Sequence, residues 1–365
     1  MLIDVIAGAR PNFMKIAAIL RAFDKRIAEG SPLRYRLVHT GQHYDARMSD
    51  DFFEQLGIPK PNVNLEVGSG TQAEQTAQIM IRYEKLLLEA PSDLCLVVGD
   101  VTSTMACAIT AQKLHIKVAH VEAGIRSNDW TMPEEINRLV TDAITNWFFT
   151  TSEFANENLR KSGISEDRIF FVGNTMIDTL LANLHRLKKP AFWDSHELVA
   201  GEYFVVTLHR PANVDKGDNF SRLLEAICEG ARGHKVVFPV HPRTAKTLKD
   251  IGDMPRNLVL VEPQPYLEFN YLVKNAKAVI TDSGGVTEET TVMGVPCMTL
   301  RNSTERPETV TMGTNELLGV DPRALRPAFE TLFTGRWKSG AIPPKWDGGA
   351  GDRIAQCVES KLLCA

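Results

Sequence analysis

The 365-residue sequence lacks the features that mark membrane-bound, secreted and nucleic-acid-binding proteins. Its apolar runs stop well short of the roughly 20 residues that a membrane-spanning helix needs. The N-terminal stretch "MLIDVIAG" is too short and too soon interrupted for a signal peptide. Lysine and arginine number 41 against 45 acidic residues, and no basic stripe occurs. We therefore expect neither a membrane nor a nucleic acid among its partners.

Cysteine is scarce, and the six cysteines include no CxxC pair. Most of them stand in apolar contexts, where a free cysteine behaves as a small apolar side chain. This usage is typical of a reduced chain, and we expect a cytoplasmic location. Also missing are the HExxH spacing of zinc sites, the GxxxxGK[ST] loop of common NTPases and the GxGxxG fingerprint of dinucleotide-binding enzymes. We expect no metal and no cofactor.

The sequence does contain a regular alternation of short β-type runs and helical stretches. Runs such as "LIDVIAG", "LCLVVGD" and "IKVAHVEAG" fall in the first half, and "YFVVTLHR", "KVVFPVH" and "AVITDSGG" fall in the second. Continuous Val, Ile and Leu runs, each followed by a helix, indicate parallel sheets covered on both faces. Two such series predict two doubly wound α/β domains, joined in the Lys- and Pro-containing stretch 185–202.

Polar residues follow several of the expected strands. These residues are Asp100, Glu122, His209, His241 and Ser283. In open α/β sheets, ligands bind beyond the carboxyl ends of the strands. This placement predicts a ligand site in a cleft between the two domains.

The segment "GARPNFMK" at 8–15 follows the first strand and opens the first helix. Gly8 lets the backbone approach a ligand, and helix N-terminal amides attract anions. Arg10 and Lys15 add positive charge at the same place. The segment therefore suits an anion, and the alternative is an ordinary turn with solvated basic side chains.

The segment "AVITDSGGVTEE" is the strongest local signal. Ser283, Gly284 and Gly285 fall where a buried strand passes into a helix, which makes a neutral cradle for a diphosphate. Glu288 and Glu289 would repel phosphate, so at least one should point elsewhere, and a ribose diol is a natural target. The alternative is a helix cap with first-turn acids that favour the helix dipole.

Three further segments carry single candidates. Arg306 in "NSTERPETV" could hold a phosphate through two N–H groups, or could form an ion pair with Glu305 or Glu308. His209, next to Arg210, ends one strand. A lone histidine of this kind, like His241, is more often structural than catalytic.

Asp100 in "LVVGDVTST" precedes a helix rich in Ser and Thr, so capping is its alternative role. The stretch "HVEAGIRSNDWTMPEEINRLV" holds Glu122, Glu134 and Glu135. They form either a solvated charged face or a group of carboxylates for acid–base chemistry. The strand-end position of Glu122 favours the second interpretation.

Eight segments in this order resemble one family over nearly the whole chain: "GARPNFMK", "HTGQHYD", "VVGDVTST", "HVEAGIRS", "VGNT", "TLHRP", "DSGG" and "TERPE". The family is that of the non-hydrolysing UDP-N-acetylglucosamine 2-epimerases. The resemblance implies a GT-B-like fold, with two Rossmann-like domains whose parallel sheets face a central cleft, and a homodimer. We assign 1–173 to the N-terminal domain, 174–348 to a UDP-binding domain, and 349–365 to a helix that returns to the N-terminal domain.

The resemblance implies interconversion of UDP-GlcNAc and UDP-ManNAc by inversion at C2. Matching motif positions makes Asp100, Glu122 and Glu134 the catalytic acids, with His209 also important. Glu135 is then structural, and we predict that it pairs with Arg138 one turn along the helix. Arg126 has no assigned role.

Substrate contacts follow from the same motif positions. They are Arg10, Lys15, Gln264, Phe269, Ser283, Gly284, Gly285, Glu289 and Arg306, with Gln264 and Phe269 flanking the uracil. In the family a second UDP-GlcNAc site activates the enzyme, and its candidates here are Gln42, His43, Arg210 and His241. The chain departs from the bacterial pattern at Ala212, where many members have glutamate, so substrate activation is left open.

The expected chemistry explains why carboxylates and cations are needed together. The C2 proton becomes acidic only after the C1–O bond breaks to give an oxocarbenium-like centre. Loss of the proton yields a glycal and UDP, and re-addition from the other face gives the epimer. Arg10, Arg306 and His209 could retain the UDP. Carboxylates close together hold mixed protonation states, but which acid serves which face is open.

Four alternatives remain at this stage. A glycosyltransferase would keep the fold but need an acceptor groove. A hydrolysing epimerase would release free ManNAc, and a related epimerase would act on a UDP-2,3-diacetamido uronic acid. A non-catalytic UDP-sugar sensor would need the nucleotide site but not three carboxylates.

Overall fold

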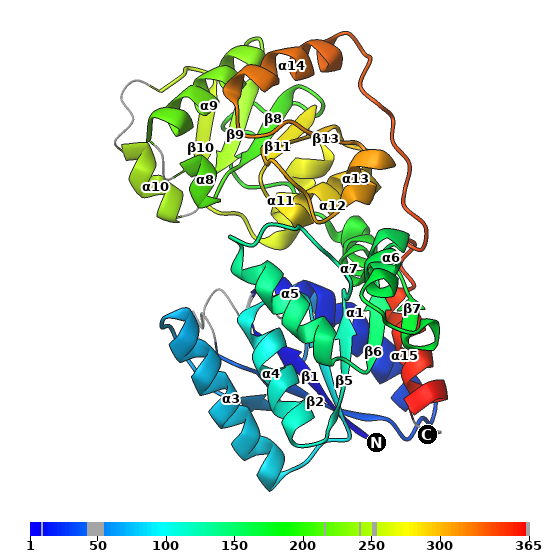
Figure 1. Ribbon diagram of the computed structural model, residues 1–365. Coiled ribbons are helices and arrows are strands. Elements are labelled where there is room, and N and C mark those ends of the chain that lie inside the picture. Colours follow the sequence, from blue (N-terminus) through cyan, green and yellow to red (C-terminus); the bar gives the residue numbers. More distant parts are fainter. Residues whose placement is uncertain (9, 42–54, 215–216, 241, 250–253, 363–365) are drawn as a thin grey trace. The chain divides into compact units, whose positions relative to one another are not determined.

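The computed structural model describes residues 1–8, 10–41, 55–214, 217–240, 242–249 and 254–362. It divides into two compact units, labelled by element in Figure 1. Unit 1 comprises Met1–Ala182 and Pro344–Ala365, and unit 2 comprises Asn183–Pro343. Each unit has its own parallel sheet with helices on both faces, so the prediction of two doubly wound α/β domains is confirmed.

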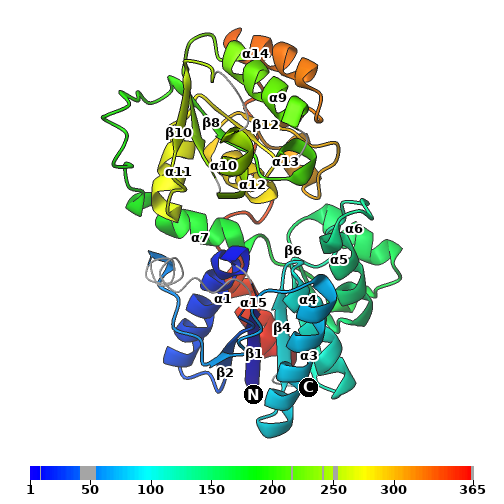
Figure 2. The ribbon, with the colours of Figure 1, turned by 90° about the vertical axis from the view of Figure 1, so that its left-hand side faces the viewer.

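Unit 1 contains a seven-stranded sheet in the order β3-β2-β1-β4-β5-β6-β7 within its described residues. Its strands are β1 (Leu2–Ala7), β2 (Arg34–His39), β3 (Val63–Asn64), β4 (Leu94–Val98), β5 (Lys117–Val121), β6 (Trp147–Thr150) and β7 (Ile169–Phe171). Its helices are α1 (Arg10–Ala28), α3 (Gln72–Glu89), α4 (Thr102–Lys113), α5 (Pro133–Ile144), α6 (Glu153–Lys161), α7 (Thr175–Asn183) and α15 (Ala350–Cys357). Figure 2 shows α1 and α15 on one face of the sheet and α3 and α4 on the other.

The central strands of unit 1 are mostly apolar and buried because helices cover both of their faces. All five residues of β4 are buried, and so are the last five of β1. The small residues of α4, among them Ala106, Cys107 and Ala111, let this helix pack closely on the sheet and on α3. Buried strands of this kind read as continuous apolar runs instead of alternating ones.

Unit 2 contains a six-stranded parallel sheet in the order β10-β9-β8-β11-β12-β13 within its described residues. Its strands are β8 (Tyr203–Thr207), β9 (Lys235–Pro239), β10 (Leu258–Val261), β11 (Ala278–Thr281), β12 (Cys297–Thr299) and β13 (Asn315–Leu317). Its helices are α8 (Pro211–Val214), α9 (Gly217–Gly230), α10 (Pro242–Lys249), α11 (Tyr266–Lys274), α12 (Gly284–Met293), α13 (Pro307–Thr311) and α14 (Leu325–Phe333).

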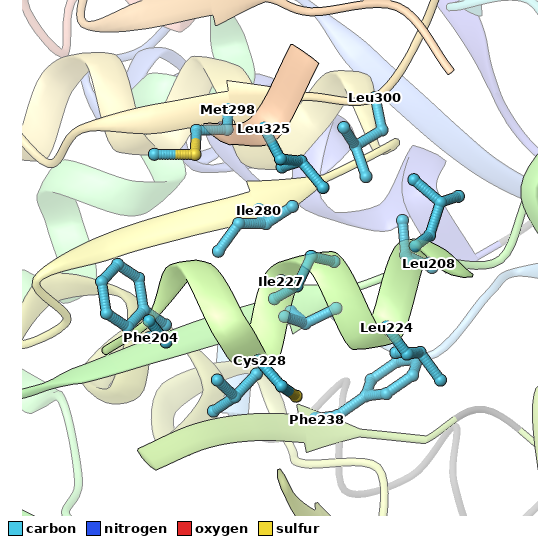
Figure 3. Packing of buried hydrophobic residues seen from close by; sticks show 14 of the residues in the cluster. Phe204, Leu208, Leu224, Ile227, Cys228, Phe238, Ile280, Met298, Leu300 and Leu325 are labelled. Atoms are coloured by element: carbon cyan, nitrogen blue, oxygen red, sulfur yellow. The ribbon is translucent and has the colours of Figure 1, made fainter. Parts of the chain in front are cut away.

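Two apolar clusters hold unit 2 together, one on each face of its sheet. In the larger one, Leu224 and Ile227 of α9 lie among strand residues that include Ile280 and Phe238 (Figure 3). Leu325 of α14 closes the same cluster. Burial of such side chains contributes roughly 25 cal/mol per Å² of apolar surface, which fixes the strands and therefore the loops that follow them.

Both sheets have a point where successive strands are added in opposite directions. In unit 1 it lies between β1 and β4, and in unit 2 it lies between β8 and β11. At such a point the two following loops diverge and leave a crevice beyond the strand ends. The sequence motifs singled out above follow these four strands or their neighbours.

The unit boundary differs from the division at 173 and 348 that the family resemblance suggested. Most of α7 belongs to unit 1, because the Thr179 hydroxyl donates to the Met14 carbonyl oxygen (2.6 Å). The chain before α15 also belongs to unit 1, since the Trp346 indole N–H donates to the Thr151 carbonyl oxygen (3.0 Å). In the described part of the chain, no helix is both long and apolar enough to cross a membrane.

Helix α15 lies against α1, as both ribbon views show (Figures 1 and 2). The closest approach is at Gly351, where an added Cβ would lie 2.5 Å from the Ala18 carbonyl oxygen. The Gly351 N–H donates to the Asp178 carboxylate of α7 (2.7 Å). Glycine is therefore required here for packing between the two helices.

Gly351→Ala should lower the free energy of unfolding of unit 1 by about 1–3 kcal/mol, because the new methyl group forces α15 away from α1. Urea denaturation of the purified variant measures this change. Gln356→Ala is the matched control, since Gln356 is exposed on the same helix and should change stability by less than about 0.5 kcal/mol. Equal effects from the two substitutions would contradict the proposed packing.

Candidate functional site

In unit 1, Glu122 directly follows β5, and its carboxylate is paired with a lysine of α1. The Lys15 Nζ lies 2.7 Å from the Glu122 Oε2; Glu122 is buried and Lys15 is largely buried, with 12% of its side chain exposed. Gly99, which follows β4, makes room for this pair: an added Cβ would lie 3.2 Å from the Lys15 Nζ and 3.9 Å from the Glu122 Oε2. Lys15, predicted as a phosphate ligand, is thus a partner of a candidate catalytic acid.

The backbone at Glu122 adopts a left-handed conformation, with φ of 69°. This costs a residue with a Cβ roughly 1–2 kcal/mol. The conformation is held because the N–H groups of Glu122 and Ala123 both donate to the Phe149 carbonyl oxygen, at 2.9 and 3.2 Å. Strained residues that the surroundings hold in place occur most often at functional sites.

Asp100 follows β4 and is held by a guanidinium group. The Asp100 Oδ2 accepts hydrogen bonds from Nε (3.0 Å) and Nη2 (2.5 Å) of Arg138 on α5. The residue at the N-cap of α4 is Val101 and not Asp100. The observed contacts therefore favour an ion pair over the capping role considered from sequence.

Glu135 and Glu134 differ in their surroundings, although they are neighbours at the start of α5. The Glu135 Oε2 lies 2.7 Å from the Arg138 Nη1, which confirms the predicted pair. The carboxylate also accepts the N–H groups of Ser127 and Asn128. Burial raises the pKa of Glu135. The hydrogen bonds and the Arg138 guanidinium lower it by a larger amount, so its pKa lies below the usual value. Glu134 is only half-buried.

In unit 2, His209 lies at the end of β8 and contacts the carboxylate that follows β11. The His209 Nδ1 lies 2.9 Å from the Asp282 Oδ1, and the ring is about half exposed. Asp282 is fully buried and also accepts the backbone N–H groups of His209 and Arg210 and the side-chain amide of Asn213. Burial raises the pKa of Asp282, but the His209 ring and these donors outweigh it and keep the pKa low. Asp282 therefore orients the histidine.

Helix α12 begins at Gly284, directly after Ser283 in the N-cap position. Gly285 is its second residue. A Cβ on Gly284 would lie 2.8 Å from the Glu305 Oε1, so the glycine lets the Glu305 carboxylate lie close to the start of the helix. Glu305 in turn pairs with Arg301 at 2.6 Å.

Arg306 and the two glutamates of α12 form a buried group. The Arg306 Nε pairs with Glu288, a partner that sequence reasoning did not consider. Glu289 lies near Asn270, whose Nδ2 donates to its Oε1 at 3.4 Å. Burial raises the pKa of Glu289 to about 7, although Asn270 and Tyr266 lower it in part. One glutamate of the pair is thus engaged by Arg306, and the other is neutral or charged according to pH.

The remaining sequence candidates fall into two groups. Gln264 and Phe269 lie at the start of α11, both half-buried, and the Gln264 Nε2 donates to the Glu262 carbonyl oxygen (2.7 Å). The Arg210 Nε donates to the Asp282 carbonyl oxygen (3.0 Å). Gln42, His43 and His241 lie outside the described residues, and Arg10 is described only as the first residue of α1.

Sequence reasoning missed the residues that hold the candidates in place. Arg138 was assigned to Glu135 alone, but it also holds Asp100, which lies 38 positions away. Asp282, which precedes the predicted phosphate cradle, was given no role. The usable signal was its position, since a carboxylate directly after a fully buried strand needs a partner. In the described part of the chain, no three His, Cys, Asp or Glu side chains gather as metal ligands.

Residues 25–359 match a protein-family model described as UDP-N-acetylglucosamine 2-epimerase. The UDP-N-acetylglucosamine 2-epimerase of Methanocaldococcus jannaschii is 42% identical over 98% of this chain and 99% of that protein. The UDP-2,3-diacetamido-2,3-dideoxy-D-glucuronate 2-epimerase of Pseudomonas aeruginosa is 39% identical over 88% of this chain and 89% of that protein.

Solved structures give the same result for the fold. The crystal structure of the M. jannaschii epimerase in complex with UDP-GlcNAc and UDP has a TM-score of 0.88 at 41% identity, covering 98% of this chain and 99% of that one. The glycosyltransferase SnogD from Streptomyces nogalater, at 15% identity, has a TM-score of 0.54 over 98% of this chain and 99% of that one. At this identity the similarity shows a shared fold and nothing about activity. The GT-B-like fold is confirmed.

The raised pKa of Glu289 predicts how stability depends on pH. Between about pH 4.5 and pH 7 the unfolded chain ionises this group while the folded chain keeps it protonated, so stability falls as pH rises through this window. The loss is at most about 3 kcal/mol, at 1.36 kcal/mol per pKa unit. Glu289→Gln should remove this component, and urea denaturation at pH 5, 6, 7 and 8 measures it.

Glu225→Gln is the control for this series, because Glu225 is exposed on α9 of the same unit. Its difference from the wild-type protein should stay constant with pH. A constant difference for Glu289→Gln as well would show that Glu289 does not titrate in this window.

Proposed function

The chain belongs to the UDP-N-acetylglucosamine 2-epimerase family, a family of isomerases, and from this premise we propose that it interconverts UDP-GlcNAc and UDP-ManNAc without releasing the free sugar. One observation of the structure carries the proposal. Asp100 and Glu122 follow the neighbouring strands β4 and β5, and each carboxylate is paired with a cation, Arg138 and Lys15 respectively. Carboxylates in fixed positions are what proton removal and return at C2 require.

The first chemical step breaks the C1–O bond, and UDP leaves with the bonding electron pair. The oxocarbenium-like centre makes the C2 proton acidic, and a carboxylate removes it to give a glycal. In the return step a proton is delivered to the opposite face of C2 while UDP adds again at C1. Nothing is oxidised or reduced, so the reaction needs no redox cofactor.

We assign the proton transfers to unit 1. A guanidinium group favours the ionised form of a nearby carboxylate, which makes Asp100 beside Arg138 suited to accept a proton. Glu122 lies beside Lys15, whose ammonium group can give up a proton and whose neutral amine can take one back. Glu134, half-buried in the first turn of α5, is the third candidate.

We assign recognition of UDP to unit 2. The start of α12 with Ser283, Gly284 and Gly285 offers backbone N–H groups to the diphosphate. Glu289 suits the ribose hydroxyl groups, and Gln264 with Phe269 suits the uracil. Arg306 supplies positive charge, and His209, oriented by Asp282, can donate a hydrogen bond. Arg10 completes the set of candidate phosphate ligands.

Two family activities compete with this proposal. The 39% identity to an epimerase named for a UDP-2,3-diacetamido uronic acid makes that substrate the first alternative. A hydrolysing epimerase is the second, and it would release ManNAc and UDP. As the family resemblance implies, we propose further that the enzyme acts as a homodimer in the cytoplasm.

Incubation with UDP-GlcNAc in deuterated water, followed by NMR, separates these activities. We expect UDP-ManNAc with deuterium at C2 and no free ManNAc, because the proton taken from C2 exchanges with solvent before return. Free ManNAc would identify a hydrolysing enzyme. No turnover of UDP-GlcNAc, with turnover of the diacetamido uronic acid derivative, would assign the other substrate.

Glu122→Gln should reduce epimerisation by at least about 10²-fold, since amides do not transfer protons as carboxylates do. UDP affinity, measured by calorimetry, should change less than about twofold. Glu166→Gln is the control, because Glu166 pairs with Arg160 on the surface of the same unit. Wild-type turnover in Glu122→Gln would exclude its catalytic role.

A further inference from the structure

A buried group of three polar side chains contacts the loops that carry the candidate catalytic carboxylates. It consists of His120 on β5, Asp142 on α5 and Arg126 in the loop between them. The His120 Nδ1 lies 2.7 Å from the Asp142 Oδ1, and the Arg126 Nη1 lies 2.6 Å from the Asp142 Oδ2. All three are buried to nine-tenths or more. We call this group the His120 network.

Both ring nitrogens of His120 face hydrogen-bond acceptors. Nδ1 faces the Asp142 carboxylate, and Nε2 lies 2.8 Å from the Gly99 carbonyl oxygen. The ring is therefore tied to an oxygen atom at both of its nitrogens, one on α5 and one in the loop after β4. Burial raises the pKa of Asp142, but His120 and Arg126 outweigh it, and its pKa lies below the usual value.

The network joins the two loops that carry the catalytic candidates. The bond from His120 to the Gly99 carbonyl oxygen fixes the peptide group that precedes Asp100. On the other side, the Asp142 Oδ2 accepts the Gly124 N–H at 3.0 Å, two residues after Glu122.

Arg126 adds a further tie to the loop after β5. Its Nη1 also donates to the Ile125 carbonyl oxygen at 2.8 Å. The loop has little room to shift, because a Cβ on Gly124 would lie 2.4 Å from the Ala155 carbonyl oxygen. One buried carboxylate thus connects the chain before Asp100 with the chain after Glu122.

We propose that His120, Asp142 and Arg126 are positioning residues that set the separation and orientation of Asp100 and Glu122 for proton transfer. This inference rests on the proposed epimerase function. The three side chains act through the two loops and touch no reacting atom in the proposal. A displacement of the reacting groups by about 1 Å can slow a reaction about 10²-fold, so loss of the His120 network should have a measurable effect on turnover.

A second buried ion pair in unit 1 gives a matched comparison. Asp4 on β1 is fully buried and accepts two hydrogen bonds from Arg36, at 2.7 and 2.8 Å. It lies toward the start of its strand, whereas Gly99 and Glu122 follow the ends of theirs. Breaking either pair leaves a buried charge without its partner and destabilises the fold, so loss of stability alone does not distinguish them.

Asp142→Asn is the test and Asp4→Asn is its control, each measured for kcat, KM, UDP affinity and hydrogen exchange. For Asp142→Asn we expect kcat to fall by about 10²-fold, with KM and the Kd for UDP within about twofold of wild type. Backbone amides in residues 99–101 and 122–127 should exchange faster in this variant only. Asp4→Asn should keep kcat within about threefold at a similar loss in Tm.

An unchanged kcat in a folded Asp142→Asn protein would overturn the proposal, and so would an equal fall in kcat for Asp4→Asn. Where Asp142→Asn does not fold, Arg126→Gln replaces it, because Arg126 lies on a loop outside the sheet and should lower kcat in the same way. Should the wild-type protein not epimerise UDP-GlcNAc, the proposed function fails. The exchange rates then still decide whether the network holds the two loops together.

Discussion

Pairing of buried charges is the constraint on which both candidate sites depend. An isolated carboxylate in the protein interior costs several kcal/mol, and a cation or a set of N–H donors must offset that cost. Glu122 has Lys15, Asp100 has Arg138, and Asp282 has His209 with two backbone N–H groups. Because these partners come from other elements, the position of each carboxylate is fixed by the packing of helices on the sheet.

The same constraint changes how the basic residues are interpreted. Sequence reasoning treated Lys15 and Arg306 as phosphate ligands, whereas the structure pairs each with a buried glutamate. A diphosphate that approaches either cation therefore competes with a carboxylate that is already present. In the proposed function, binding of the substrate is thereby coupled to the charge state of these glutamates, and in unit 2 the neighbouring Glu289 with its raised pKa belongs to the same group.

Much of the fold and part of the site could be predicted from sequence. Apolar runs and their spacing indicated two parallel α/β domains, and eight motifs in order identified the family; both are confirmed. The Glu135–Arg138 pair was also within reach, since residues three apart on a helix are neighbours. The pairing of Lys15 with Glu122 could not be predicted, because the two residues are 107 positions apart and meet only through the order of the strands in the sheet. The boundary at α7 likewise depends on contacts with α1 that no local pattern records.

The return of residues 344–365 to unit 1 also has a consequence for how the chain is made. Unit 2 is inserted within the sequence of unit 1, so a ribosome completes all of unit 2 before it adds α15. During that interval the surface of α1 around Ala18 is uncovered, although domains generally fold as units in the order of synthesis. Unit 1 can therefore reach its final packing only after its neighbour in the sequence has been synthesised, although all seven described strands of its sheet are made first.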